Sequence, residues 1–325
     1  MSRKILFRCD CGPEVGFGHF TRSLSLARAL KAKGASISFW GELDAFARAA
    51  LSKHAIGRLK GAPGGFRGQD APKALAAAQG FDAFVVDSYA LEQGYVDAIA
   101  DRCALAVFDD QRKLRLAEAA LGICFRAGAE SAPTGAKKEA LGLEYLVVPP
   151  ELRALREKRL KAEPGPIRRV LVFFSGRAFD PALLAKAVRL CADALPKAEI
   201  RYLTRDGRPL EGVPGTALAP TPAVETLYAA ADLLVNGGGL VKYEAAYCAL
   251  PSAALSQTEL QDEDTKVLAK LGLTLDLGRA EGFDAEAAKV RLAALAEDPS
   301  AQRAAFQKHL DTGSTERLAE LVLTL

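Results

Sequence analysis

Short apolar runs alternate with longer helical patterns along almost the whole chain, and this alternation limits the fold more than any other feature. Strands that are each followed by a helix form parallel sheets with helices on both faces. The pattern therefore predicts an α/β protein. The expected strands of the first half are residues 5–9, 37–40, 84–86, 104–108, 123–125 and 145–148.

The alternation breaks once, near the middle. A charged stretch, 151–161, is followed by Glu163-Pro164-Gly165-Pro166, and two prolines and a glycine within four residues interrupt a helix. At roughly 100–200 residues per domain, 325 residues suggest two domains. We expect a Rossmann-like domain over 1–150, a linker over 151–167, and a second Rossmann-like domain over 168–325, with a cleft between the two domains.

The charge balance argues against two classes of partner. Lys and Arg number 43 and Asp and Glu 40, a net charge of +3, which favours neither nucleic acid nor an anionic membrane surface. No uncharged apolar stretch reaches the 18 residues of a membrane span, and no signal-peptide core follows the first strand. We therefore expect a cytoplasmic protein, either a monomer or a weak dimer.

The cysteines and histidines argue against a metal centre. Six cysteines are spread along the chain and there are only three histidines. This usage is typical of reduced, buried thiols and offers no repeated ligand spacing. We expect neither a metal nor an organic cofactor.

The first candidate motif lies where the first strand meets the first helix. Its glycines allow a tight turn, and the helix start beyond them favours a phosphate or a developing anion. An imidazole can take a proton from water or a hydroxyl near neutral pH, so His19 is a candidate base. Asp10 is expected to orient it or to hold a sugar hydroxyl; capping of the strand end is the alternative. The motif comprises Arg8, Asp10, Gly16, Gly18, His19 and Arg22.

A second glycine-rich junction follows the strand at 233–235. Three consecutive glycines favour a close approach of the main chain to a diphosphate. Glu244, about one turn into the next helix, is placed to reach the hydroxyls of a ribose; a solvated glutamate is the alternative. The loop at 256–261 lies at the same edge. The candidate nucleotide-binding residues are Asn236, Gly237, Gly238, Gly239, Leu240, Glu244, Glu259 and Gln261, together with Gly176.

Three further candidates follow short apolar strands. Asp87, Tyr89 and Asp109 are placed to bind sugar hydroxyls or, for the aspartates, a cation. The alternative for the aspartates is capping of the next loop or helix.

These motifs resemble a known family. Arg8-x-Asp10 followed by Gly16-x-Gly18-His19-x-x-Arg22 is similar to the N-terminal signature of the UDP-2,4-diacetamido-2,4,6-trideoxy-β-L-altropyranose hydrolases of pseudaminic acid biosynthesis and of the related SpsG-type spore-coat proteins. Residues 86–89, 108–110, 142–145 and 237–251 fall in the same order. Gly239-Leu240 and Glu259-Leu260-Gln261 depart from the usual hydrolase residues.

The resemblance implies a GT-B fold, with a UDP-sugar as substrate. It implies that His19 activates water, and that a UDP-linked acetamido sugar is hydrolysed to free sugar and UDP without a metal. A GT-B glycosyltransferase, which moves the sugar to an acceptor hydroxyl, is the alternative. A non-catalytic nucleotide-sugar binding protein is a third possibility.

Overall fold

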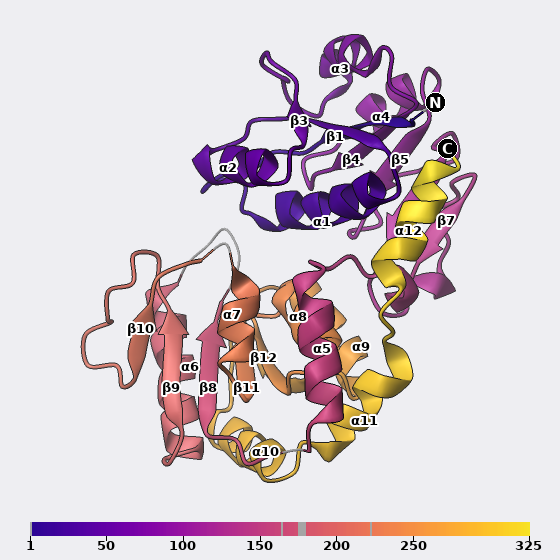
Figure 1. Ribbon diagram of the computed structural model, residues 1–325. Coiled ribbons are helices and arrows are strands. Elements are labelled where there is room, and N and C mark those ends of the chain that lie inside the picture. The colour runs from indigo at the N-terminus through magenta and orange to yellow at the C-terminus, as the bar shows by residue number, and fades with distance from the viewer. Residues whose placement is uncertain (1, 164, 175–179, 222) are drawn as a thin grey trace. The chain divides into compact units, whose positions relative to one another are not determined.

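The computed structural model describes residues 2–163, 165–174, 180–221 and 223–325. The chain divides into two compact units (Figure 1). The first comprises Met1–Pro149 and Thr312–Leu325, and the second comprises Pro150–Asp311. Each unit contains one parallel sheet and its own helices, as the alternation of strand and helix predicts.

The first unit has a seven-stranded sheet in the order β3-β2-β1-β4-β5-β6-β7. Its strands are β1 (Lys4–Arg8), β2 (Ser36–Trp40), β3 (Gly57–Arg58), β4 (Ala83–Asp87), β5 (Leu105–Phe108), β6 (Leu121–Cys124) and β7 (Glu139–Leu141). Its helices are α1 (Gly18–Ala32), α2 (Ala45–Lys53), α3 (Ala71–Ala78), α4 (Gln93–Ala100) and α12 (Ser314–Leu323), with short 3₁₀ turns at Gly68–Asp70, Ala129–Ser131 and Leu143–Tyr145.

The second unit has a six-stranded sheet in the order β10-β9-β8-β11-β12-β13. Its strands are β8 (Arg169–Phe173), β9 (Glu199–Leu203), β10 (Thr216–Leu218), β11 (Leu233–Asn236), β12 (Ser252–Ser256) and β13 (Leu275–Arg279). Its helices are α5 (Glu151–Lys161), α6 (Pro181–Ala194), α7 (Val224–Ala229), α8 (Val241–Tyr247), α9 (Glu259–Lys270), α10 (Ala285–Glu297) and α11 (Ser300–His309).

Both sheets reverse their strand order at a central pair. In the first unit the chain builds outward from β1 to β3, then returns to place β4 on the other side of β1. The second unit repeats this at β8 and β11. The connections leave such a pair in opposite directions, so a crevice opens at its carboxyl end, where ligands of this fold class bind. Ligand-binding residues are therefore expected in the loops after β1, β4, β8 and β11.

Alternating side chains of each sheet pack under the helices. In the first unit Leu6, Phe84, Val86 and Val107 face α3 and α4. In the second, the apolar side chains of β8, β9, β11 and β12 pack against α6 and α10. Burial on both faces explains why these strands read as continuous apolar runs in the sequence.

The segment 151–167 is not a linker throughout, which corrects the predicted linker. Residues 151–161 form α5, which belongs to the second unit. Arg156 is buried and donates to the main-chain oxygens of Tyr247, Phe306 and Leu310, at 2.5–2.8 Å. These carbonyls lie at helix ends, where the helix itself supplies no donor. In this charged stretch, Arg156 therefore supplies hydrogen bonds to carbonyl groups at helix ends.

The end of the chain returns to the first unit, which is a second correction to the predicted boundary. Helix α12 contacts α1 (Figure 1). Thr315 bonds to the main chain at Val148 and Leu146, and Glu320 pairs with Lys33 at 2.8 Å. A division by position along the chain assigns this segment to the wrong half.

The predicted strand at 145–148 is also wrong. The strand of this region is β7, at Glu139–Leu141, and Leu143–Tyr145 forms a 3₁₀ turn. Leu146, Val147 and Val148 are buried without joining the sheet. Short apolar runs indicate burial more reliably than they indicate a strand.

Candidate functional site

The loop that joins β1 to α1 is a compact turn that positions His19. The main-chain amides of Val15 and Gly16 both donate to the Gly12 oxygen, at 3.2 and 2.8 Å. Gly16 has a φ of +91°, and a Cβ added there would meet nothing within 4 Å. Gly18 is the first residue of α1, and His19 follows it. The glycine pattern therefore predicted a turn at the correct place.

Asp87, not Asp10, is the partner of His19. The Nδ1 atom of His19 lies 2.6 Å from Oδ1 of Asp87, the last residue of β4. Both side chains are buried, Asp87 with only 1% of its surface exposed. The carboxyl ends of β1 and β4 are neighbours at the reversal of strand order, which brings together two residues 68 positions apart. This contact corrects the prediction that Asp10 orients His19.

The carboxylate of Asp87 determines the tautomer of His19. Burial by itself raises the pKa of Asp87, but the charges of Arg22 and His19 and their hydrogen bonds outweigh burial and hold it well below its usual range. An ionised carboxylate only accepts hydrogen bonds, so the facing Nδ1 carries the proton. The Nε2 atom of His19 is then the one that can accept a proton.

Arg22 belongs to the same buried group. Its Nε and Nη2 atoms donate to the two oxygens of Asp87, each at 2.5 Å, and its Nη1 donates to Asp110 at 2.5 Å. Among the described residues, its polar contacts are to His19 and to these two carboxylates. The prediction that Arg22 binds substrate is therefore corrected: its guanidinium holds the site together.

Arg8 and Asp10 form a second pair, on the other side of the β1 loop. Arg8 is fully buried, lies over the ring of Phe66 at 3.9 Å, and pairs with Asp10. It also donates to the Gly64 oxygen at 2.8 Å, while Asp10 accepts from the amide of Glu42 at 2.8 Å. Both side chains brace the surrounding loops. Arg8 is thus not placed to bind substrate, which is a further correction.

The remaining candidates of the first unit have separate roles. Asp109 accepts from the amides of Lys113 and Leu114, at 3.3 and 3.0 Å, so it caps a turn, as the alternative interpretation held. Tyr89 is 48% exposed and lies edge-on against the His19 ring, with ring centroids 4.4 Å apart. Tyr89 therefore stays a candidate for contact with a ligand.

The glycine-rich loop of the second unit joins β11 to α8, a helix of seven residues. Gly238 has a φ of +79°, and its amide donates to the Asn236 side chain at 2.9 Å. A Cβ at Gly237 would lie 2.5 Å from Nε2 of Gln257, and one at Gly238 would lie 2.9 Å from Oγ of Ser256. Packing against the loop after β12 is thus sufficient reason for glycine at both positions.

Glu244 faces a partner that the sequence did not reveal. The hydroxyl of Tyr228, a residue of α7, donates to Oε2 of Glu244 at 2.6 Å. Burial raises the pKa of Glu244 to about 7, although the hydrogen bond from Tyr228 lowers it. A helix-interior tyrosine gives no sequence signal for this contact.

The other candidates of this edge divide into three cases. Gln261 forms a capping box with Thr258 at the start of α9, and its Oε1 accepts from the amides of Gln257 and Thr258 at 3.0 and 3.2 Å. Its side chain therefore caps a helix, and the nucleotide contact stays a prediction. Glu259 is exposed in the first turn of α9. Gly176 lies outside the described residues.

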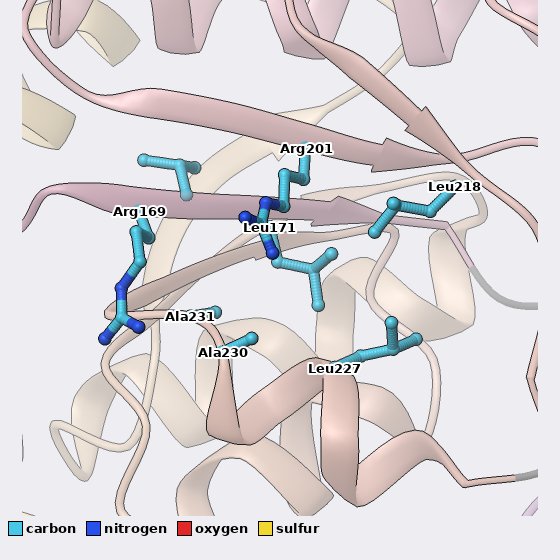
Figure 2. A pocket seen from close by; sticks show the side chains of 8 residues that line it. Arg169, Leu171, Arg201, Leu218, Leu227, Ala230 and Ala231 are labelled. Atoms are coloured by element: carbon cyan, nitrogen blue, oxygen red, sulfur yellow. The ribbon is translucent and has the colours of Figure 1, made fainter.

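A small hollow on the second unit lies away from these loops. Figure 2 shows Arg169 and Arg201 on the strands, Leu227 on α7 and Ala230 just after α7 at its walls. Both arginines are paired, with Asp232 at 2.6 Å and with Glu199 at 2.7 Å. The hollow contains none of the predicted site residues.

Two findings in the described part of the chain concern a membrane span and a metal site. No helix there is both long and apolar enough to cross a membrane. No three His, Cys, Asp or Glu side chains gather there as a metal ion would require. That the reaction needs no metal or cofactor stays a prediction.

The chain resembles solved structures along its whole length. Acinetobacter baumannii MurG superposes with a TM-score of 0.67 at 13% identity, over 99% of this chain and 100% of that one. LpCGTa in complex with UDP gives 0.70 at 16%, over 99% of both chains. The spinosyn rhamnosyltransferase SpnG complexed with thymidine diphosphate gives 0.68 at 17%, also over 99% of both.

The chain has the GT-B fold. The two parallel α/β units match these neighbours over their full length, and the predicted fold class is confirmed. No family model matches the sequence, and no curated protein matches it. At 13–17% identity the likeness concerns the GT-B fold alone, so function has to be argued from the residues.

Proposed function

We propose that this GT-B protein transfers a glycosyl group from a nucleoside diphosphate sugar to an acceptor hydroxyl, with His19 as the base. The observation that carries the proposal is the buried contact of His19 with Asp87, 2.6 Å long. It leaves Nε2 as the proton acceptor and provides a carboxylate to stabilise the imidazolium that forms.

The proposed transfer replaces one bond at the anomeric carbon by another. As the acceptor oxygen forms its bond to the anomeric carbon, the bond from that carbon to the diphosphate oxygen breaks. The acceptor proton moves to Nε2 of His19, and the electron pair leaves with the diphosphate. We propose that Tyr89, which is exposed beside the His19 ring, contacts the acceptor.

We assign the nucleotide to the second unit. The loop Gly237–Leu240 would face the diphosphate, and Glu244 would bind the ribose hydroxyls. Two GT-B neighbours of similar full-length superposition were solved with UDP and with thymidine diphosphate, which supports a nucleoside diphosphate donor. UDP is the first nucleotide to test because the resemblance of residues 8–22 is to enzymes that use UDP-sugars.

Hydrolysis of the same donor is the second candidate. The likeness of residues 8–22 to the hydrolases of pseudaminic acid biosynthesis favours it, and His19 would then take its proton from water. Both reactions need the same base and the same leaving group, so the nature of the acceptor alone separates them.

The test measures UDP release from UDP-linked acetamido sugars, with and without an acceptor panel of hydroxylated lipids, aromatics and sugars. We expect release to depend on an acceptor and to yield a glycosylated product. Release that matches free sugar, with no acceptor present, would establish the hydrolase instead. In either case His19→Ala should reduce turnover roughly 100-fold or more, with UDP affinity within about twofold of wild type. Turnover that His19→Ala leaves unchanged would exclude both.

A further inference from the structure

Asp110 is a buried carboxylate that the proposed reaction does not use. It follows β5, has 5% of its surface exposed, and contacts Arg22 through Oδ2. Its Oδ1 atom is buried and has no hydrogen-bond partner within the described residues. Burying a carboxylate costs free energy, and only one oxygen of this carboxylate contacts the neighbouring arginine.

The contact controls how Arg22 shares its charge. Two nitrogens of its guanidinium face Asp87 and the third faces Asp110, all at 2.5 Å. Burial by itself lowers the pKa of Arg22, but Asp110 and then Asp87 outweigh it and hold the pKa well above its usual range. Arg22 is therefore always a cation, and Asp110 compensates the part of its charge that Asp87 does not.

The charges of this group do not cancel when His19 is neutral. Two carboxylates then face one guanidinium, so Arg22, Asp87 and Asp110 carry one net negative charge. The proton that His19 accepts in the proposed reaction brings the sum to zero.

Other polar groups around His19 change this balance little. Ser23, on α1, donates to Asp87 at 3.4 Å, and burial raises the pKa of the Cys9 thiol, which keeps it neutral. The rings of Tyr89 and His19 are nearly perpendicular, so Tyr89 adds no formal charge there. Arg126 donates to the main-chain oxygen of Asp110 at 3.1 Å and is half-buried, so water screens its charge.

We propose that Asp110 is a positioning residue: through Arg22 it leaves the charge of Asp87 available to His19, so that His19 can carry a proton during the reaction. Asp110 itself touches neither His19 nor a substrate in this account. The inference rests on the proposed role of His19 as a base, but its test does not require any particular donor or acceptor.

The test follows the titration of His19 by NMR in the free protein. The chain has only three histidines, so the His19 signals can be assigned by their loss in His19→Gln. In Asp110→Asn, which removes a negative charge while keeping the size of the side chain, we expect the His19 midpoint to move to lower pH by about half a unit or more. A midpoint equal to that of wild type would overturn the proposal.

Two further variants separate a charge effect from a packing effect. Asp82→Asn makes the same charge change at Asp82, whose carboxylate bonds to the Lys4 amide at the other edge of the sheet, and it should leave the midpoint unchanged. Asp110→Glu keeps the charge, so its His19 midpoint should lie closer to that of wild type than to that of Asp110→Asn. If Asp110→Asn does not fold, Asp110→Ser takes its place under the same criteria.

The pH–rate profile gives the second readout. In Asp110→Asn we expect a plateau kcat about 3- to 10-fold lower and an acid limb displaced to lower pH, with the donor KM unchanged. A lower kcat with an unmoved acid limb would indicate a merely structural role and would overturn the proposal. If the NMR midpoint moves but no donor turns over, the proposed function fails, whereas the effect of Asp110 on His19 through Arg22 stands.

Discussion

The two sheets reverse their strand order in the same way, but the carboxyl edges they form are chemically different. In the first unit, four ionisable side chains meet after β1, β4 and β5: His19, Arg22, Asp87 and Asp110. In the second unit, the loop after β11 is made of glycines packed against Ser256 and Gln257. One edge gathers ionisable side chains, whereas the other is a buried glycine turn packed against a neighbouring loop.

The buried charged side chains of the two units also differ in what they contact. Lys242, fully buried in α8, pairs with Asp264 at 2.8 Å and so ties α8 to α9. In the first unit the buried pairs include the candidate base itself. The same topology therefore brings together ionisable side chains at one edge and tightly packed glycines at the other.

The largest effect is expected where the charged edge is broken at Asp87. Asp87→Asn removes the charge that faces His19 and allows the wrong tautomer, so kcat should fall roughly 100-fold or more. Asp10→Asn is the matched comparison, because Asp10 follows the neighbouring strand β1 but pairs with Arg8. It should lower the free energy of unfolding by about 1–2 kcal/mol and change kcat less than about fivefold.

Steady-state kinetics and thermal unfolding of both variants check this prediction. A larger loss of kcat in Asp10→Asn than in Asp87→Asn, with both proteins folded, would restore Asp10 as the partner of His19. Asp87→Asn must first be shown to be folded, because it leaves Arg22 with only one compensating carboxylate.

The error about Asp10 shows where sequence reasoning reaches its limit. The glycine turns, the start of α1 and the fold class follow from local patterns, because turn geometry and burial act over a few residues. The pairing of His19 with Asp87 depends on which strands are neighbours. Nearness along the chain favoured Asp10, whereas the reversal of strand order selects a residue 68 positions away.

Other misses have the same physical origin. Tyr228 reaches Glu244 because α7 and α8 lie close in the folded unit, and no spacing rule announces this contact. The return of α12 to the first unit likewise depends on tertiary packing. Asp110 does have a sequence signal, because it is the second of two aspartates at the end of an expected strand, but only Asp109 is among the sequence candidates.

A smaller effect is expected where the glycine edge is changed at Gly238. Gly238→Ala forces an alanine to a φ of +79° and places its Cβ 2.9 Å from Oγ of Ser256. We expect a loss of about 1–3 kcal/mol in the free energy of unfolding and roughly a tenfold loss in UDP affinity. The NMR midpoint of His19 should not move, because the change lies in the other unit.

Gly282→Ala is the matched control. Gly282 has a φ of +77°, but an added Cβ meets nothing within 4 Å, so the variant carries the backbone strain without the clash. Calorimetric titration with UDP compares the two. Equal UDP affinity in Gly238→Ala, Gly282→Ala and wild type would remove the glycine loop from the nucleotide site.

The smallest effect is a pH dependence at Glu244. Burial raises the pKa of this carboxyl group to about 7, so it loses its proton between pH 6 and 8. A carboxylate accepts hydrogen bonds from ribose hydroxyls better than a neutral acid, so UDP affinity should rise about three- to tenfold across this range. Glu244→Gln should bind UDP with little pH dependence. An affinity of wild type that stays flat from pH 6 to 8 would argue against a ribose contact.

Stability should change with pH in the opposite direction. The folded protein holds the Glu244 proton more tightly than the unfolded chain, whose glutamate has its ordinary pKa of 4.5. The stabilisation from this proton is complete below that value and is lost as pH rises toward about 7. The melting temperature of wild type relative to that of Glu244→Gln should therefore fall between pH 4.5 and 7, while UDP affinity increases from pH 6 upward. Opposite slopes of stability and affinity in one residue would mark Glu244 as a group that gives up stability to bind its ligand.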